Sequence, residues 1–169
     1  MSAFLVLLPF PEGYMRVLLA SSSWLMVLTP ALLAQNPPTT KPDSLHWGPA
    51  PAVFPAGARL AVVSGDPFKA GMFTIELALP DGYRLMPHFH PTDEAIKVKQ
   101  GTFVFGMGDT FDAAKAKSMM VGDTGTVRAN MHHYASAKGA TIVAVTAMGP
   151  FALTYVNPAD DPQKQVAKP

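Results

Sequence analysis

A chain of 169 residues with 13 basic and 12 acidic side chains is long enough for one folded domain and carries a formal net charge of only +1. No basic block or stripe appears, which argues against nucleic acid as a partner. The lack of cysteine excludes disulfides, thiolate metal sites and cysteine nucleophiles. The 17 prolines and 13 glycines are many for a helical protein, so the composition favours strands and turns.

The first 34 residues have the pattern of a secretory signal. A single arginine precedes an apolar run over residues 17–34, a small residue ends this run, and polar sequence follows. We expect residues 1–34 to be cleaved, with Met15 as an alternative start, which predicts an exported, periplasmic or secreted protein without stable membrane association. The alternative is a retained anchor, because the run is close to the shortest length that crosses a bilayer, but Pro30 weakens this interpretation.

Three further segments follow the predicted signal. Residues 35–45 are polar and proline-rich and predict an extended linker, residues 46–157 predict the folded domain, and residues 158–169 predict a polar, loosely ordered tail. The runs that predict strands cover residues 59–63, 73–79, 83–90, 94–99, 102–107, 124–128, 132–136, 141–148 and 151–156. Residues 111–117 are the one helical candidate. Short strands without alternating helices predict an all-β sandwich or barrel.

Two histidines stand one residue apart in HFHPTDE, residues 88–94. Because side chains alternate on a strand, His88 and His90 should point to the same side, where one ion could lie between them. The turn that follows brings an acidic residue back towards the same place. Imidazole and carboxylate donors without thiolate suit one divalent transition metal ion, such as Fe, Mn, Zn, Ni or Cu.

The choice of carboxylate depends on the strand that begins after this turn. If Glu94 points inward, Ile96 points inward with it and Lys97 faces solvent. An inward Asp93 would instead bury Lys97 and Lys99, which is energetically costly. The alternation therefore favours Glu94.

The spacing of these residues resembles the first motif of the cupin superfamily. Five residues separate Gly82 from His88, three separate His90 from Glu94, and six separate Glu94 from Gly101. The resemblance implies a double-stranded antiparallel β-helix, the jelly-roll or cupin barrel, with a metal ion inside.

The second motif of the family, which supplies a third histidine, is kept only in part after Gly122. Arg128 and Asn130 stand where the family has a proline and a glycine, and Asn tolerates a positive φ better than most residues. The spacing selects His133 as the third histidine. The alternative, His132, is its neighbour and would then be exposed or contact a ligand from outside.

The predicted metal ligands are His88, His90, Glu94 and His133. This set leaves two positions open on an octahedral ion for water, dioxygen or two oxygen atoms of a substrate. The resemblance implies a metal-binding protein that acts on a small organic molecule, as a dioxygenase or an isomerase-type metalloenzyme. The alternative is an exported, non-catalytic module that binds or senses a small ligand or a metal, since the fold does not determine the activity.

Several further residues have competing interpretations, and no catalytic residue is identified. By period 2, Met86 and Arg84 share the face of His88, which predicts Met86 in the cavity wall and Arg84 in a solvated position or at the rim. Tyr134 should point away from an inward His133, and Tyr155 is a second candidate proton donor.

The remaining apolar residues predict packing surfaces. The methionines after the linker are expected mostly in the core. Leu85 and Phe89 fall on the opposite face of the strand that carries His88, where they would supply apolar surface for a homodimer.

Overall fold

The structure is a computed structural model that describes residues 45–165. The predicted signal, residues 1–34, and the linker up to residue 44 lie outside the described residues. No helix in residues 45–165 combines the length and the apolar character needed to cross a membrane.

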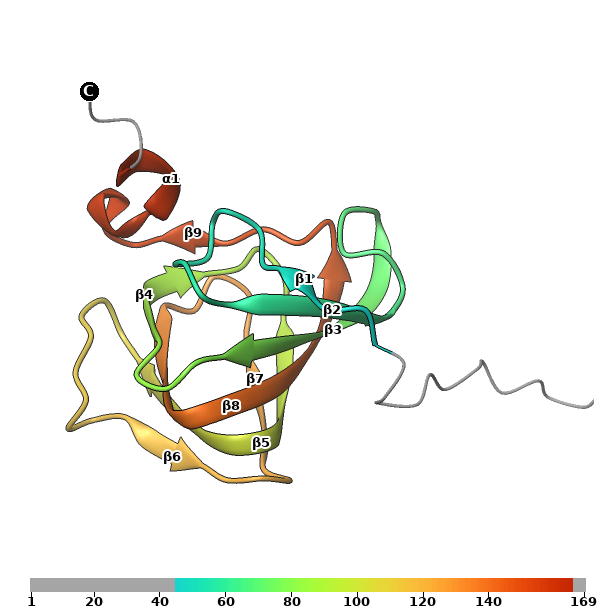
Figure 1. Ribbon diagram of the computed structural model, residues 1–169. Helices are drawn as coiled ribbons and strands as arrows, with labels where there is room; N and C mark the ends of the chain where they lie inside the picture. Colours follow the sequence, from blue (N-terminus) through green and yellow to red (C-terminus); the bar gives the residue numbers. More distant parts are fainter. Residues whose placement is uncertain (1–44, 166–169) are drawn as a thin grey trace, which may run out of the picture. The chain divides into compact units, whose positions relative to one another are not determined.

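Strands dominate the described part of the chain (Figure 1). In chain order the elements are β1 (Gly48–Pro49), β2 (Arg59–Ser64), β3 (Gly71–Leu79), β4 (Arg84–Phe89), β5 (Glu94–Met107), β6 (Lys117–Met119), β7 (Thr124–Val127), β8 (His133–Gly149), β9 (Thr154–Tyr155), the 3-10 helix η2 (Pro158–Asp160) and α1 (Pro162–Gln165). All strand pairs are antiparallel. The predicted all-β class is confirmed.

Two long strands, β5 and β8, run through the whole domain and pair with each other along their length. Residues 141–149 of β8 lie between β3 and β5, whereas residues 133–136 lie between β4 and β5. One layer therefore has the order β1-β2-β3-β8-β5-β7 and the other the order β9-β4-β8-β5-β6. The expected jelly roll is thus one hydrogen-bonded sheet that folds over on itself.

Glycines allow the long strands to bend between the layers. The pairing of β5 with β8 shifts register on both sides of Gln100. Gly101 has a φ of +72°, and a Cβ there would lie 2.5 Å from the Ala140 carbonyl oxygen. On the facing strand, Gly139 has a φ of +76°. The sequence predicted separate strands before and after each bend, residues 94–99 and 102–107 and residues 132–136 and 141–148, and the structure joins each pair into one strand, β5 and β8.

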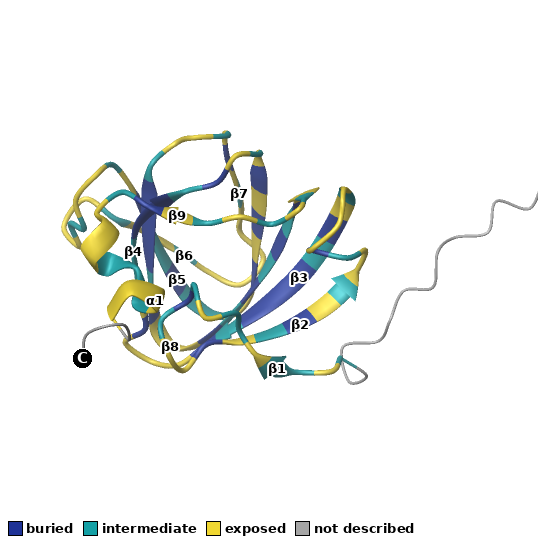
Figure 2. Ribbon diagram, turned by 90° about the horizontal axis from the view of Figure 1, so that it is seen from above, coloured by how far each residue is buried: buried dark blue, intermediate teal, exposed yellow. Residues whose placement is uncertain are grey.

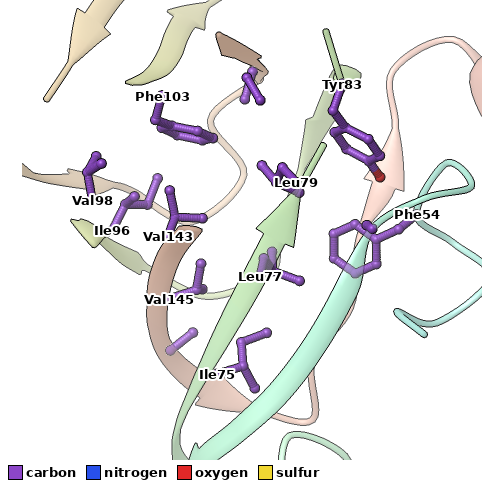
Figure 3. Packing of buried hydrophobic residues seen from close by; sticks show 14 of the residues in the cluster. Phe54, Ile75, Leu77, Leu79, Tyr83, Ile96, Val98, Phe103, Val143 and Val145 are labelled. Carbon is purple, nitrogen blue, oxygen red and sulfur yellow. The ribbon is translucent and has the colours of Figure 1, made fainter. Parts of the chain in front are cut away.

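The core lies between the two layers. The alternation predicted for β3 is confirmed, because Phe73, Ile75, Leu77 and Leu79 are buried, and buried and more exposed residues alternate along the strands in Figure 2. Figure 3 shows Ile75, Leu77 and Leu79 of β3 facing residues of β5 and β8, including Ile96, Val98, Phe103, Val143 and Val145. Each fully buried aliphatic or aromatic side chain contributes about 1.5–3 kcal/mol.

The predicted helix over residues 111–117 is wrong, because this stretch forms turns. The Asp112 carboxylate accepts a hydrogen bond from the Ala114 amide, at 3.0 Å, and the Asp112 carbonyl accepts from the Lys115 amide, at 3.2 Å. An aspartate side chain that binds its own backbone competes with helix propagation.

The beginning of the tail is more ordered than the sequence predicted. The Asn157 side chain accepts a hydrogen bond from the Ala159 amide, at 3.1 Å, and so caps η2, and α1 follows directly. A side-chain cap with a proline at the first helical position is enough to start a turn.

The expectation that the methionines fill the core is wrong. Among the seven methionines of residues 45–165, none is buried. Two are half-buried, Met86 and Met119, and the others are exposed, namely Met72, Met107, Met120, Met131 and Met148.

Candidate metal centre

A bulge in β4 positions the first histidine. Leu85 pairs with Ala135 and His88 with His133, so β4 carries one residue more than β8 over this interval. Pro87 lies inside it and has no amide hydrogen to join the ladder. The extra residue shifts the alternation, and Leu85, not Met86, lines the interior. The prediction that Met86 forms the cavity wall is therefore wrong, and Leu85 does not belong to an outer apolar face.

Three histidines converge between the layers. His88 on β4 and His133 on β8 are each 2% exposed, and His90 follows β4 in the turn. One ring nitrogen from each lies within 4.8 Å of the other two. These three imidazoles could hold a metal ion.

Backbone carbonyls fix the orientation of all three rings. The Nδ1 atom of His88 lies 2.8 Å from the Met86 oxygen, that of His90 lies 2.7 Å from the Ala152 oxygen, and that of His133 lies 2.9 Å from the Met131 oxygen. A carbonyl only accepts, so each Nδ1 carries the hydrogen and each Nε2 keeps its lone pair. Metal-binding histidines are oriented in this way.

Glu94 completes the group from the start of β5. Its Oε2 atom lies 3.4 Å from Nε2 of His133 and 3.6 Å from Nε2 of His90. The side chain is buried, Ile96 is buried with it, and Lys97 is exposed, as the alternation predicted. The structure therefore brings all four predicted ligands together, although ligation by Glu94 stays a prediction.

Asp93, the rejected alternative, lies on the outside and joins two loops. Its Oδ2 atom is 2.9 Å from Nη1 of Arg128, and its Oδ1 atom accepts a hydrogen bond from the Ala129 amide, at 2.9 Å. These two contacts, the amide first, hold the pKa of Asp93 below its usual value. The residue after Ala129 is Asn130, whose amide donates to the His90 carbonyl, at 2.7 Å.

The glycine positions of both motifs have a structural reason. Gly82, Gly101 and Gly122 have φ values of +72°, +72° and +95°. Asn130 has a φ of +62° and is the one residue other than glycine with a positive φ in the described chain. The interpretation that Asn replaces a turn glycine at this place is confirmed.

The electrostatics of the centre favour a bound cation. Burial, followed by the neighbouring His133 and His90, lowers the pKa of His88 well below its ordinary value of 6.5. A neutral imidazole keeps its Nε2 lone pair for a ligand. With Glu94 ionised, the donor set carries one negative charge. Nitrogen and carboxylate donors without sulfur fit a divalent transition metal, and the set lacks the many oxygens that Mg²⁺ or Ca²⁺ prefers.

The histidines and Glu94 belong to the lining of a small cavity. The centre of a water molecule can occupy a volume of about 30 Å³ in this cavity. A cavity that holds one water molecule needs roughly 10–15 Å³ by the same measure. The other lining residues are Phe54, Leu77, Leu79, Tyr83, Leu85, Ile96, Phe103, Phe105, Ala135, Val143, Val145, Phe151 and Leu153. Apart from the four predicted ligands, Tyr83 is the one polar residue of this lining, and its hydroxyl donates to the Pro55 carbonyl, at 2.9 Å.

The other candidates of the sequence lie outside this cavity. His132 is on the surface, with its Nδ1 atom 2.6 Å from Oδ1 of Asp109. Arg84 is exposed, and its guanidinium lies 5.3 Å from the centroid of the Phe111 ring. The solvated position expected for Arg84 is therefore confirmed.

Neither candidate tyrosine presents a free hydroxyl to the cavity. Tyr134 points away from it, as predicted, and donates to the Asp112 carbonyl, at 2.8 Å. Tyr155 donates to the Val53 carbonyl, at 2.8 Å, and burial raises its pKa above the ordinary value.

Sequence reasoning missed the segment after β8 as part of the site. The Ala152 carbonyl orients His90, and the ring of Phe151 lies 5.3 Å from the ring of His90. Phe54 in turn stacks on Phe151, with 5.9 Å between the ring centroids. The apolar run at residues 151–156 was visible, but nothing in its pattern indicates which loop it covers.

No protein-family model matches the sequence, and no curated protein matches it at a significant level. Solved structures do match. A candidate acetylacetone dioxygenase from Methylibium petroleiphilum is 22% identical with a TM-score of 0.57, over 75% of this chain and 85% of its own. A cupin 2 conserved barrel domain protein from Rhodopseudomonas palustris is 15% identical with a TM-score of 0.55, over 73% and 87%. An RmlC-like cupin from Shewanella frigidimarina is 15% identical with a TM-score of 0.53, over 67% and 91%.

Proposed function

Because this chain has the cupin fold and gathers three imidazoles in an apolar cavity, we propose that it is a metal-dependent enzyme that adds dioxygen to a small organic molecule. The observation that carries the proposal is that the polar side chains of the cavity are almost all predicted metal ligands, whereas the rest of the lining is apolar. Every polar group of the lining except the Tyr83 hydroxyl belongs to the predicted ligand set. These four residues would hold the ion, and a substrate bound to it would lie among apolar walls.

The composition of the lining favours oxygenation over isomerisation. A proton-transfer reaction needs an acid or base within hydrogen-bond reach of the substrate. Tyr83 is the one titratable residue of the lining besides the predicted ligands, its hydroxyl is engaged by Pro55, and burial raises its pKa above the ordinary value. The reactivity would therefore come from the ion, which supplies Lewis acidity and electron exchange with dioxygen when bound.

The chain's own residues would bind, orient and shield the reactants. The carbonyls of Met86, Ala152 and Met131 hold the imidazoles in one tautomer, so that little reorganisation is needed when a ligand arrives. The aromatic and aliphatic walls keep bulk water away from the open positions.

The size and charge of the cavity point to a compact substrate. The volume of about 30 Å³ that water centres can occupy is small, and no lysine or arginine lines the described cavity to bind a second anionic group. A divalent ion with three neutral imidazoles and one carboxylate leaves one positive charge, which matches a single enolate. A small β-diketone has this chemistry, and the similar M. petroleiphilum protein carries acetylacetone in its name.

Oxygen uptake tests the proposal directly. Metal-free protein would be loaded anaerobically with Fe(II), Mn(II), Zn(II), Ni(II) or Cu(II), and each form mixed with small β-diketones, catechols, thiols and keto-acids. We expect one redox-active metal to support oxygen consumption. When the dioxygen is labelled with a heavy isotope, both of its atoms should appear in the products, and the substrate should be the one source of electrons. Glu94→Gln should abolish this uptake, whereas His46→Gln, a change at an exposed histidine, should preserve it.

A protein that retains metal but consumes no oxygen with any compound would instead support the non-catalytic binding module. Export and dimerisation belong to the proposal as well. N-terminal sequencing of protein from the periplasm tests cleavage near residue 34. Light scattering during size exclusion tests dimerisation. Leu85 no longer supports a dimer interface, because it lines the cavity.

A further inference from the structure

A second group of metal donors lies on the outside of the domain. An open groove is lined by Met107 and Gly108 at the end of β5, by Asp109, and by the loop residues Asn130, Met131 and His132. We propose that this groove binds one soft monovalent metal ion, Cu(I), through the His132 imidazole and the thioether sulfurs of Met107 and Met131. This site is separate from the buried centre and does not depend on the proposed enzyme activity.

His132 is held in the orientation of a ligand. Its Nδ1 atom lies 2.6 Å from Oδ1 of Asp109, which leaves Nε2 as the remaining donor atom of the ring. One face of the ring packs near Phe89, with 5.1 Å between the ring centroids. A carboxylate that binds one nitrogen of an imidazole, while the other nitrogen binds metal, is a common arrangement around protein metal sites.

The two methionines are exposed although their side chains are apolar. Met107 is 46% and Met131 is 48% exposed, and both lie on the wall of the groove that contains His132. Apolar side chains that stay exposed in the same groove as an oriented imidazole gain little from hydration. Their thioether sulfurs are accessible and can bind a metal ion without a rearrangement of the backbone.

Backbone hydrogen bonds join the two segments that carry the donors. The Gly108 amide donates to the His132 carbonyl, at 2.9 Å, which joins the end of β5 to the start of β8. The Met131 amide donates to the Arg128 carbonyl, at 3.1 Å, and closes the loop in front of His132. The groove is therefore built on two segments that the fold already fixes.

The donor types determine which ion the groove prefers. Thioethers are soft, uncharged ligands, and with one imidazole they favour Cu(I) over the divalent ions of the first transition row. The lining of the buried centre contains no sulfur. Sulfur ligation of copper would therefore exclude the buried centre, and the methionine variants then distinguish the groove from other exposed methionines.

X-ray absorption at the copper edge, with the full chain loaded anaerobically with one equivalent of Cu(I), tests the proposal. We expect sulfur and nitrogen neighbours around copper in the wild-type protein. In Met107→Leu/Met131→Leu the sulfur neighbours should disappear, and affinity measured against a chelator should fall by roughly tenfold or more. Met120→Leu/Met148→Leu changes two exposed methionines outside the groove and should keep both properties.

Two results would overturn the assignment. One is a copper spectrum of the wild-type protein with nitrogen and oxygen neighbours only. The other is Cu(I) binding by Met107→Leu/Met131→Leu with unchanged affinity and unchanged sulfur neighbours. Because the replaced side chains are exposed, the variants should melt at the wild-type temperature, so a folding defect is not expected to confuse the readout.

Discussion

His88 and His133 face each other across neighbouring strands, as Cα partners in the pairing of β4 with β8, with ring centroids 4.1 Å apart. Each Nδ1 atom binds the carbonyl of the residue two positions earlier, Met86 for His88 and Met131 for His133. The same local arrangement thus occurs on both strands. Both Nε2 atoms are oriented by the chain itself, before any ion binds.

The first prediction separates the two neighbouring histidines. His133→Gln should lower the affinity of the buried centre for Zn(II) or Fe(II) by roughly tenfold or more, because a buried nitrogen donor is lost. His132→Gln should leave divalent metal content unchanged, because His132 lies outside the cavity. Metal analysis of dialysed protein measures both. An equal loss in the two variants would contradict the assignment of His133 as the inner residue.

The second prediction concerns the carboxylate. Glu94→Gln keeps the size of the side chain but removes its charge beside the Nε2 atoms of His90 and His133, so metal affinity should fall by roughly tenfold or more. Asp93→Asn is the matched control and should retain metal, because Asp93 contacts Arg128 and Ala129 on the outside. Isothermal titration with metal-free protein measures both affinities. Metal loss in Asp93→Asn alone would reverse the choice between the two acids.

The third prediction is a pH dependence of the metal-free protein. The pKa of His88 in the folded state lies well below 6.5, so the unfolded chain takes up a proton first as the pH falls. The free energy of unfolding should therefore be highest above about pH 6.5 and decrease below it, by up to about 1.4 kcal/mol per pH unit from this group. Urea unfolding with a chelator present measures the slope.

His88→Gln should flatten this slope between pH 6.5 and about pH 5, where histidines titrate and most carboxylates do not. His46→Gln, at an exposed histidine, should leave it unchanged. An identical slope in wild-type protein and His88→Gln would show that the buried imidazole does not cause the effect.

The fourth prediction tests packing away from the metal. A Cβ on Gly106 would lie only 2.2–2.4 Å from the outer atoms of the Tyr134 ring, which is 1% exposed and held by the Asp112 carbonyl. Gly106→Ala should therefore destabilise the protein by about 1–3 kcal/mol in chemical denaturation. Gly48→Ala, where a Cβ meets nothing within 4 Å, should be neutral or slightly stabilising. A neutral Gly106→Ala would mean that Tyr134 moves easily.

The fifth prediction tests whether the space in the cavity is needed for the substrate independently of metal binding. Ala135 lines the cavity and is buried, so Ala135→Leu should fill much of its small free volume. We expect metal to be retained and kcat/KM for oxygen uptake to fall at least roughly tenfold. Ala144→Leu, on the same strand but outside the cavity lining, is the control. Unchanged kcat/KM in Ala135→Leu would place the reaction outside this cavity.

Much of the candidate site could be predicted from local spacing. His88, His90 and Glu94 lie within one strand, one turn and the start of the next strand, so their short spacing along the chain brings them together. His133 required the partly kept second motif, and Asn130 at a left-handed position explains why that motif still forms its turn. These features depend on few neighbours along the chain.

What could not be predicted depends on contacts between distant segments. The bulge at Pro87 reverses the alternation beyond it, so period 2 from His88 selected Met86 in place of Leu85. The Ala152 carbonyl orients His90 from 62 residues away. The exposed methionines also escaped the pattern, because a hydrophobic residue type does not indicate the face on which tertiary packing leaves it.

Strand β8 both supplies a predicted ligand and pairs with the strands that carry two others, which has a consequence for how the centre forms during folding. This strand supplies His133, and its two ends pair with β4 and β5, which carry His88 and Glu94. A nascent chain that has emerged only as far as residue 130 therefore lacks both a donor and the template that aligns the others. If the centre binds an ion as proposed, tight binding would require the last long strand to be docked, so the ion would be acquired late in folding.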